Sequence, residues 1–330
     1  MATGEVTART RWSSGTWSGA WAPRVVAFCV LALVFAAVSV VDGPQNGYLK
    51  VLLWLWLASV CWNIAEHPRR HLEFLRDWSV PLALLVLYTY SRQLADNLGT
   101  TIHVHEPVVA DRLLGGGDIP SSRLQDWMCG DPCNPTGPPQ WYDHLLWAVW
   151  FSHFFVGMTL AVVLWVRNRT AWLGWMRRYF GLCFVALVGY VTYPMAPPWM
   201  ASLDGALPHD VQRLTARGWI GPRPSGVEDP HSWAGNAVAA MPSLHAGVAF
   251  LVAIYAIQRL RSAWRWAALA YPVLMSFALV YLGEHYVVDV LVGAGCAVAV
   301  LALCSAWERW RSGPETLAPA AHEEAVGASR

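Results

Sequence analysis

Two short stretches decide how this chain folds and where its chemistry lies. The first is Ala-Met-Pro-Ser-Leu-His, from Ala240 to His245, and the second is Gly-Glu-His-Tyr-Val-Val-Asp, from Gly283 to Asp289. Two long apolar runs separate them along the chain. The polar side chains of the two stretches can therefore meet only in three dimensions, when apolar helices pack side by side.

The second stretch contains a histidine and a carboxylate with helical spacing. His285 and Asp289 are four residues apart, so on a helix they share one face. The carboxylate can then accept a proton from one imidazole nitrogen, which leaves the other nitrogen free as a base, nucleophile or ligand. A single His–Asp pair of this kind, taken by itself, is usually structural. Inserting an Asp near the middle of a membrane, however, costs on the order of 3 kcal/mol of free energy, so its presence there indicates function.

The first stretch has the features of a helix start. Pro242 fits the first helical position, because the N–H that proline lacks needs no partner there. Ser243 and His245 would then occupy the first turn, where free backbone N–H groups favour an anion. An anion site that faces a His–Asp pair suits phosphoryl transfer, in which one imidazole attacks and the other protonates the leaving group.

Taken together, the two stretches resemble a known family. Pro-Ser-Leu-His at 242–245, followed by His-Tyr-Val-Val-Asp at 285–289, resembles the type 2 phosphatidic acid phosphatase superfamily. Leu244 and the upstream Tyr-Pro-Met-Ala-Pro-Pro, which begins at Tyr193, resemble its inositol phosphorylceramide synthase-like branch. The resemblance covers residues 78–300.

This resemblance implies a set of roles for the matching residues. His285 would be the nucleophile that forms a phospho-histidine, Asp289 would orient it, and His245 would protonate the leaving oxygen. Ser243 would help to bind phosphate, and we include Leu244 and Tyr193 among the substrate-binding residues. The resemblance implies no metal ion and no other cofactor.

The sequence departs from the phosphatase branch at two places. It has no Lys-x6-Arg-Pro motif, and Leu279 stands six residues before His285, where that branch has an Arg. Two cations that would neutralise phosphate are therefore missing. The departures weigh more against hydrolysis than against phosphoryl transfer as such.

Three other polar residues are candidates for the substrate site. Arg92 and Arg112 are candidates for the missing phosphate-binding cations. Arg92 also lies four residues before Asp96, and the alternative interpretation is a snorkelling arginine with a local partner. His153 lies well inside an apolar run, where it either lines the acceptor pocket or contacts a neighbouring helix.

Composition indicates a polytopic membrane protein. Hydrophobic residues make up 55% of the chain and charged residues 14%, and the mean hydropathy is +0.34. These values are too apolar for an ordinary soluble chain of this length. Many of the 21 Trp residues lie near the ends of apolar runs, as at a membrane–water interface. The net charge of +1 excludes the basic footprint of a nucleic-acid-binding protein.

We therefore predict an all-α membrane bundle of about eight transmembrane helices. The apolar runs are 25–41, 49–64, 78–94, 141–166, 180–194, 246–257, 266–282 and 287–306. We expect one transmembrane catalytic domain over 24–308, with a six-helix phosphatase-like core at 78–306 and cytoplasmic tails at 1–23 and 309–330. Polar loops are expected at 97–140 and 199–240.

The first long loop contains two possible small sites. Cys129 and Cys133 are separated by three residues, which favours a small disulfide loop in an oxidising compartment over a zinc knuckle. His103 and His105 alternate like metal ligands on a strand, but no further ligand cluster follows. The loop thus favours a disulfide over a metal site, and the spacing alone leaves open whether Cys129 and Cys133 pair.

The basic residues provide an independent prediction of topology. If the N-terminus is cytoplasmic and the spans alternate, 16 of the 23 basic residues fall in the inside segments. The seven outside are Lys50, Arg92, Arg112, Arg123, Arg213, Arg217 and Arg223. Every short loop then obeys the positive-inside rule. Both stretches fall at the extracytoplasmic ends of their helices, in a multi-pass protein of the cell membrane.

The sequence thus favours a membrane phosphotransferase that acts on a lipid-linked phosphate, with a membrane lipid as its partner. The same site with water as acceptor would be a lipid phosphatase. A proton-coupled transporter would use His153, His245, His285 and Asp289 as a relay, but needs polar groups spread across the bilayer. A metalloenzyme lacks obvious third and fourth ligands.

Overall fold

The fold is known from a computed structural model, which describes residues 21–43, 45, 47–65, 68–95, 98–220 and 238–312. Within these ranges the chain forms helices, turns and isolated β-bridges, without longer strands. Most of the two predicted tails, Asp96 and the part of the second loop at 221–237 lie outside the described residues.

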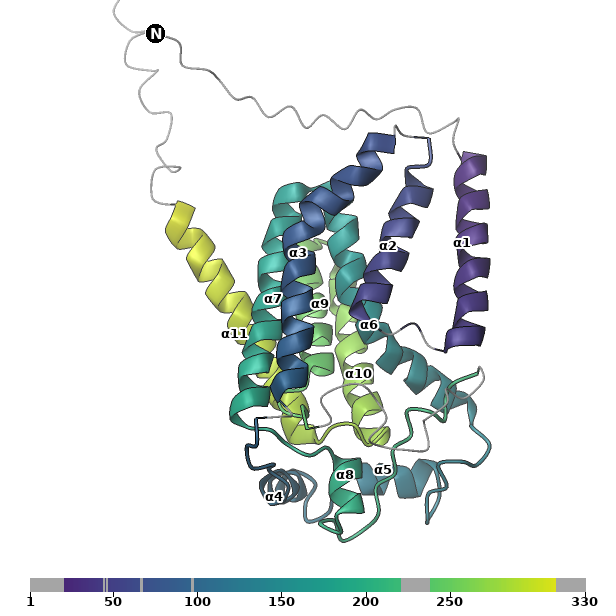
Figure 1. Cartoon of the computed structure of the whole chain (residues 1–330). Helices are drawn as coiled ribbons and strands as arrows, with labels where there is room; N and C mark the ends of the chain where they lie inside the picture. The colour runs from purple at the N-terminus through teal and green to yellow at the C-terminus, as the bar shows by residue number, and fades with distance from the viewer. Residues whose placement is uncertain are drawn as a thin grey trace, which may run out of the picture.

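Long helices standing side by side form the body of the molecule (Figure 1). They are α1 (Trp21–Asp42), α2 (Tyr48–Trp62), α3 (Pro68–Ala95), α6 (Trp141–Arg167), α7 (Arg169–Thr192), α9 (Leu244–Arg259), the 3-10 helix η1 (Ala263–Leu269) with α10 (Ala270–Tyr281), and α11 (Val287–Ser312). Each predicted apolar run falls on one of these elements, which confirms the all-α membrane bundle.

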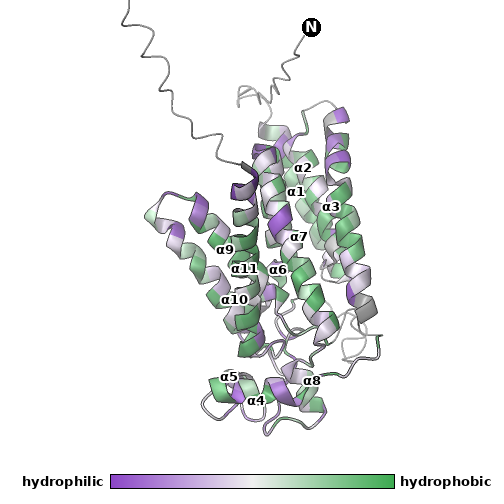
Figure 2. Ribbon diagram, turned by 90° about the vertical axis from the view of Figure 1, so that its left-hand side faces the viewer, coloured by the Kyte–Doolittle hydropathy of each residue, from purple (hydrophilic) through white to green (hydrophobic). Residues whose placement is uncertain are grey.

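Length and composition support membrane spans directly. Within the described residues, four stretches are long and apolar enough to cross a membrane, namely Trp21–Asp42, Trp141–Arg167, Ala263–Tyr281 and Val287–Arg311. The helices α2 and α9 are shorter and also apolar. In Figure 2 the long helices are mostly hydrophobic, and hydrophilic residues concentrate towards their ends.

Three short helices gather at one end of the bundle, where the sequence predicted only polar loops (Figure 1). They are α4 (His105–Leu114), α5 (Pro120–Met128) and α8 (Pro198–Leu203). We call these helices, with the segments 98–140 and 193–220 that carry them, the cap. The prediction of irregular loops was wrong because nine- or ten-residue helices stabilised by tertiary packing give only a weak signal in a sequence.

Two helix starts were also predicted too late. α3 begins at Pro68 and α7 at Arg169, each about ten residues before its apolar run. Both extensions carry arginines, so they do not belong to an apolar run. The helix nevertheless continues through them beyond its hydrophobic section. In α7 the extension is anchored, because Arg178 pairs with Glu308 of α11 at 2.7 Å.

The main hydrophobic core joins α2, α3, α6, α7, α9 and α11. Its fully buried members include Trp78, Trp175, Tyr179 and Leu251. A second cluster joins α6, α9 and α10, and it contains Leu279 with no exposed surface. The position at which the phosphatase branch has an Arg is thus occupied by a core side chain.

Close contact between α9 and α11 brings the two sequence stretches together. A Cβ atom at Gly293 would lie 2.2 Å from the backbone oxygen of Ser243, and one at Gly247 would lie 3.2 Å from the Gly293 oxygen. Only glycine allows backbones to approach this closely. The start of α9 therefore lies directly against the first turns of α11.

Candidate active site

The start of α9 differs by two residues from the prediction. The helix begins at Leu244, with Ser243 as its N-cap, and Pro242 lies outside it. The Ser243 hydroxyl accepts the N–H of Ala246 at 3.3 Å, as N-cap serines commonly do. Leu244 packs into the main core with 6% of its surface exposed. Ser243 thus shapes the helix start, and Leu244 contributes to the hydrophobic core.

His285 and Asp289 form the predicted pair. Nδ1 of His285 lies 2.9 Å from Oδ2 of Asp289, and the two residues expose 6% and 0% of their surface. His285 precedes α11 and is not part of it, and only Asp289 lies in the first turn. An ionised carboxylate has no proton to donate, so Nδ1 donates and Nε2 remains available for chemistry.

A tight turn between α10 and α11 presents His285. It contains Gly283 with a φ of +74°, a conformation that favours glycine. A Cβ atom there would lie 2.6 Å from the Gln212 oxygen, so the cap also presses on this turn. Gln125 of α5 holds the same region, because its amide donates to the backbone oxygens of Gln212 and Tyr281.

His245 faces this pair from the first turn of α9. Its ring centroid lies 5.7 Å from that of His285, with 58° between the ring planes. Its Nε2 is buried and has no hydrogen-bond partner in the part of the chain that the structure describes. Two imidazoles at this separation can contact one phosphoryl group from two sides.

Aromatic side chains of helix α6 pack against His245. The His153 ring lies 4.0 Å from the His245 ring, and the Trp150 ring stacks on His245 with 5.9 Å between the centroids and 14° between the planes. His153 is 2% exposed. The structure therefore brings His153 into direct contact with the predicted acid.

The two candidate cations have different positions. Arg92, near the end of α3, is close enough to interact electrostatically with both His153 and His245. Arg112 points outward on α4, where its Nε donates to the Gly117 oxygen at 3.0 Å. Arg92 thus lies near the two histidines, whereas Arg112 is turned away from them.

Tyr193 packs against the other segment of the cap. It follows α7 and stacks on His103 at 3.9 Å with 12° between the rings. His103 in turn pairs with Glu106 of α4 at 3.1 Å. Among the described residues there is no group of three or more His, Cys, Asp or Glu side chains that could hold a metal ion.

Two charged residues beside the site could not be predicted from spacing. Arg213 of the cap binds Glu284, the residue before His285, with Nε 2.6 Å from Oε1. Its guanidinium also lies 4.7 Å from the Trp199 ring centroid. Asp111 of α4 is fully buried and accepts the N–H of Val288 at 3.2 Å. Both contacts link segments far apart in the sequence, so no local pattern marks them.

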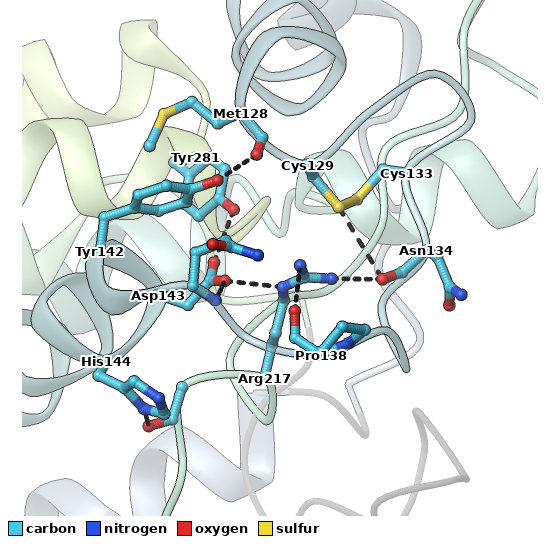
Figure 3. A network of polar contacts seen from close by, with 12 residues as sticks. Met128, Cys129, Cys133, Asn134, Pro138, Tyr142, Asp143, His144, Arg217 and Tyr281 are labelled. Carbon is cyan, nitrogen blue, oxygen red and sulfur yellow. Dashed lines mark hydrogen bonds and ion pairs between the residues drawn. A yellow bond between two sulfur atoms is a disulfide. The ribbon is translucent and has the colours of Figure 1, made fainter.

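A buried polar network fixes the cap to the bundle (Figure 3). Asp143, in the first turn of α6, accepts Nε of Arg217 at 2.9 Å and the hydroxyl of Tyr281 at 2.7 Å. Arg217 also donates to the backbone oxygens of Asn134 and Pro138. The network joins α6, α10 and both cap segments.

The cap also contains the predicted disulfide. Cys129 and Cys133 are bonded to each other directly beside this network (Figure 3). The pairing closes the small loop that follows α5.

Comparison with known proteins gives the family. Residues 139–304 match the PAP2 superfamily, and this match spans α6 to α11 with both sequence stretches. The chain belongs to the PAP2 superfamily. This confirms the resemblance drawn from the two stretches.

A named relative supports the branch. A phosphoinositol dihydroceramide synthase of Bacteroides thetaiotaomicron is 31% identical over 144 residues, which cover 40% of this chain and 45% of that protein. The matched segment is thus less than half of the relative's length. The chain resembles the inositol phosphorylceramide synthase-like branch, as predicted. No solved structure matches the chain.

Proposed function

We propose that this protein is an integral membrane phosphotransferase. It moves a phosphorylated headgroup from a lipid donor to His285 and then to an alcohol acceptor. One observation carries the proposal: His245 and the His285–Asp289 pair converge, with 5.7 Å between the two imidazole centroids. Membership of the PAP2 superfamily supports a lipid phosphate or phosphodiester as substrate.

The first half-reaction uses the imidazoles in opposite roles. Nε2 of His285 attacks phosphorus, and the bond from phosphorus to the leaving lipid oxygen breaks. His245, protonated at this stage, gives its proton to that oxygen. Asp289 holds the Nδ1 proton of His285 at 2.9 Å and stabilises the positive charge that develops on the ring.

The second half-reaction reverses these roles. The acceptor hydroxyl loses its proton to His245 and attacks phosphorus, and the phosphorus–nitrogen bond breaks. His285 returns to the neutral form, and His245 is protonated again for the next cycle. If water takes the place of the alcohol, the same steps amount to phosphatase activity.

Other site residues would bind the substrate. Arg92 is the cation best placed to neutralise the phosphate, because it already interacts with His153 and His245. His153 would hold the His245 ring and border the acceptor. A phosphoinositol-type headgroup is supported by the name of the Bacteroides relative.

The orientation in the membrane forms part of the proposal. We infer that the cap and the site face the extracytoplasmic side of the cell membrane. The excess of arginines at the opposite helix ends supports this orientation. A disulfide in the cap is also of the kind that persists in an oxidising compartment.

Headgroup transfer by the purified protein tests the function. The assay offers phosphatidylinositol and a ceramide in mixed micelles, with lipid products identified by mass spectrometry. We expect transfer that EDTA does not reduce and that His285→Ala lowers by at least about 1,000-fold. His209→Ala, at an exposed cap histidine, is the matched control and should be unchanged. Full activity of the His285 variant would contradict the proposal, and release of free inositol phosphate would show that water, not an alcohol, is the acceptor.

A further inference from the structure

A carboxylate of the cap reaches the helix end that carries Asp289. Asp111, on α4, has no exposed surface, and its Oδ1 accepts the N–H of Val288 at 3.2 Å. Because α11 begins at Val287, this N–H belongs to the first turn and has no acceptor within its own helix. Asp111 thus caps α11 from a different element.

The capped residue is the immediate neighbour of Asp289. Asp289 belongs to the same helical turn as Val288, and its carboxylate holds the Nδ1 side of His285. A displacement of this turn would therefore move the carboxylate away from the imidazole. A misplacement of about 1 Å at a catalytic group can cost on the order of 100-fold in rate.

The two acids also share one buried, donor-poor region. Oδ2 of Asp111, Oδ1 of Asp289 and the hydroxyl of Tyr286 are all buried without a hydrogen-bond partner among the described residues. The titratable groups that face Asp111 are Asp289 and Tyr286, and His285 stands behind Asp289. The charge on Asp111 therefore acts directly on Asp289.

Burial raises the pKa of Asp111 to about 6, and the negative charge of Asp289 adds to the rise. As pH rises through this value, Asp111 becomes charged. The added negative charge favours the positively charged form of His285, which the attack on phosphorus produces.

We propose that Asp111 is a positioning residue of the phosphotransferase site: by capping α11 from α4, it sets the placement and charge of Asp289 and so couples the cap to the nucleophile. This inference rests on the proposed function. It adds a second carboxylate, from outside the two sequence stretches, to the groups that govern His285.

Two substitutions separate the hydrogen bond from the charge. Asp111→Asn is isosteric and keeps an oxygen for the Val288 N–H, whereas Asp111→Ala removes both the acceptor and the charge. Glu106→Gln is the matched control, because Glu106 lies on the same helix with its side chain 61% exposed. All four proteins are assayed for transfer from pH 5 to pH 8.

We expect a split between kcat and KM. Asp111→Ala lowers kcat about tenfold or more with KM unchanged, since Asp111 affects the nucleophile and not lipid binding. Asp111→Asn keeps the hydrogen bond, so its kcat exceeds that of Asp111→Ala. It lacks the charge, so its kcat stays near the low-pH value of the wild type and loses the inflection near the pKa of about 6. Glu106→Gln matches the wild type. An unchanged kcat in Asp111→Ala, or an unchanged pH profile in Asp111→Asn, would overturn the inference.

A further variant keeps the inference testable if the Asp111 variants fail to fold. Val288→Pro removes the N–H that Asp111 accepts and leaves Asp111 itself in place, and a helix tolerates proline in its first turn. We expect it to lower kcat as Asp111→Ala does, and a wild-type kcat would contradict the capping role.

One measurement separates this inference from the proposed function. Diethyl pyrocarbonate modifies neutral imidazole, and peptide mass spectrometry gives its rate at His285 without any lipid substrate. We expect Asp111→Ala to change this rate and Glu106→Gln to leave it unchanged. If the wild type has no transfer activity but Asp111→Ala still changes the modification rate of His285, only the proposed function is contradicted. If the wild type is active but Asp111→Ala leaves the modification rate of His285 unchanged, only the role of Asp111 is contradicted.

Discussion

At the scale of single residues, the proposed chemistry depends on which ring nitrogen of His285 carries the proton. Asp289 accepts the Nδ1 proton at 2.9 Å and has no exposed surface. This arrangement leaves Nε2 unprotonated, as the proposed attack on phosphorus requires. The contact was predictable from a four-residue spacing, and it is retained although His285 lies in a turn before the helix.

The variant Asp289→Asn tests this orientation. An amide can present N–H in place of the acceptor oxygen, which favours the wrong tautomer and provides no charge for the developing imidazolium. We expect kcat to fall by about 100-fold or more, with KM little changed. Asp126→Asn, at an exposed position of α5, is the control and should retain full activity. A variant of Asp289 with wild-type kcat would exclude an orienting role.

The residue scale also shows where sequence reasoning ends. His245, His285 and Asp289 carry recognisable spacing, so they could be named in advance. Asp111 and Arg213 could not, because Asp111 meets Val288 across 177 positions and Arg213 meets Glu284 across 71. Arg112, the neighbour of Asp111, was proposed instead, and the turn of α4 directs it away from the site.

At the scale of elements, the site depends on the contact between α9 and α11. A Cβ atom at Gly293 would meet three backbone atoms of Ser243 at 2.2 to 3.3 Å, and backbone cannot move aside as a flexible side chain can. The contact fixes His245 relative to Asp289. Glycine at this position is therefore part of the site's geometry.

Gly293→Ala should separate the two helices. We expect a loss of about 1–3 kcal/mol in stability, as for other overpacked sites, together with a large loss of transfer activity. Gly295→Ala on the same helix is the matched control, since a Cβ atom there has no other atom within 4 Å. Thermal unfolding in detergent and the transfer assay measure both effects. Equal behaviour of the two variants would show that the close approach is unimportant.

The helices themselves were largely predictable, because long apolar runs have few alternatives in a membrane. The cap was not. Its helices α4 and α5 have ten and nine residues and are held by tertiary contacts such as those of Gln125. The predicted position of Pro242 as the first helical residue was wrong because Ser243 supplies the side-chain oxygen that caps the helix.

At the scale of the whole molecule, the cap and the site lie at the same end of the bundle (Figure 1). The buried Asp143–Arg217 pair and the Cys129–Cys133 bond hold the cap segments together beside α6. A lipid-linked substrate would therefore meet the histidines beneath an ordered cover. This cover can exclude water and so favour an alcohol acceptor over hydrolysis.

Labelling of the cap tests the orientation of the whole molecule. Ile220 is 85% exposed, so a cysteine introduced there is accessible. In intact cells or spheroplasts we expect a membrane-impermeant maleimide to label Ile220→Cys. A cysteine in place of Arg261, between α9 and η1, should be labelled only after lysis. The reverse pattern would place the site on the cytoplasmic side.

The central claim is that His285 carries the phosphorylated headgroup between donor and acceptor. The most direct measurement incubates the protein with a donor lipid labelled in its headgroup, without acceptor, followed by rapid quenching at alkaline pH and peptide mass spectrometry. We predict a labelled phosphoramidate on the peptide containing His285, which disappears when acceptor is added and is absent from His285→Ala. Transfer that proceeds at the wild-type rate with label on another residue, or with no labelled protein, would contradict the account.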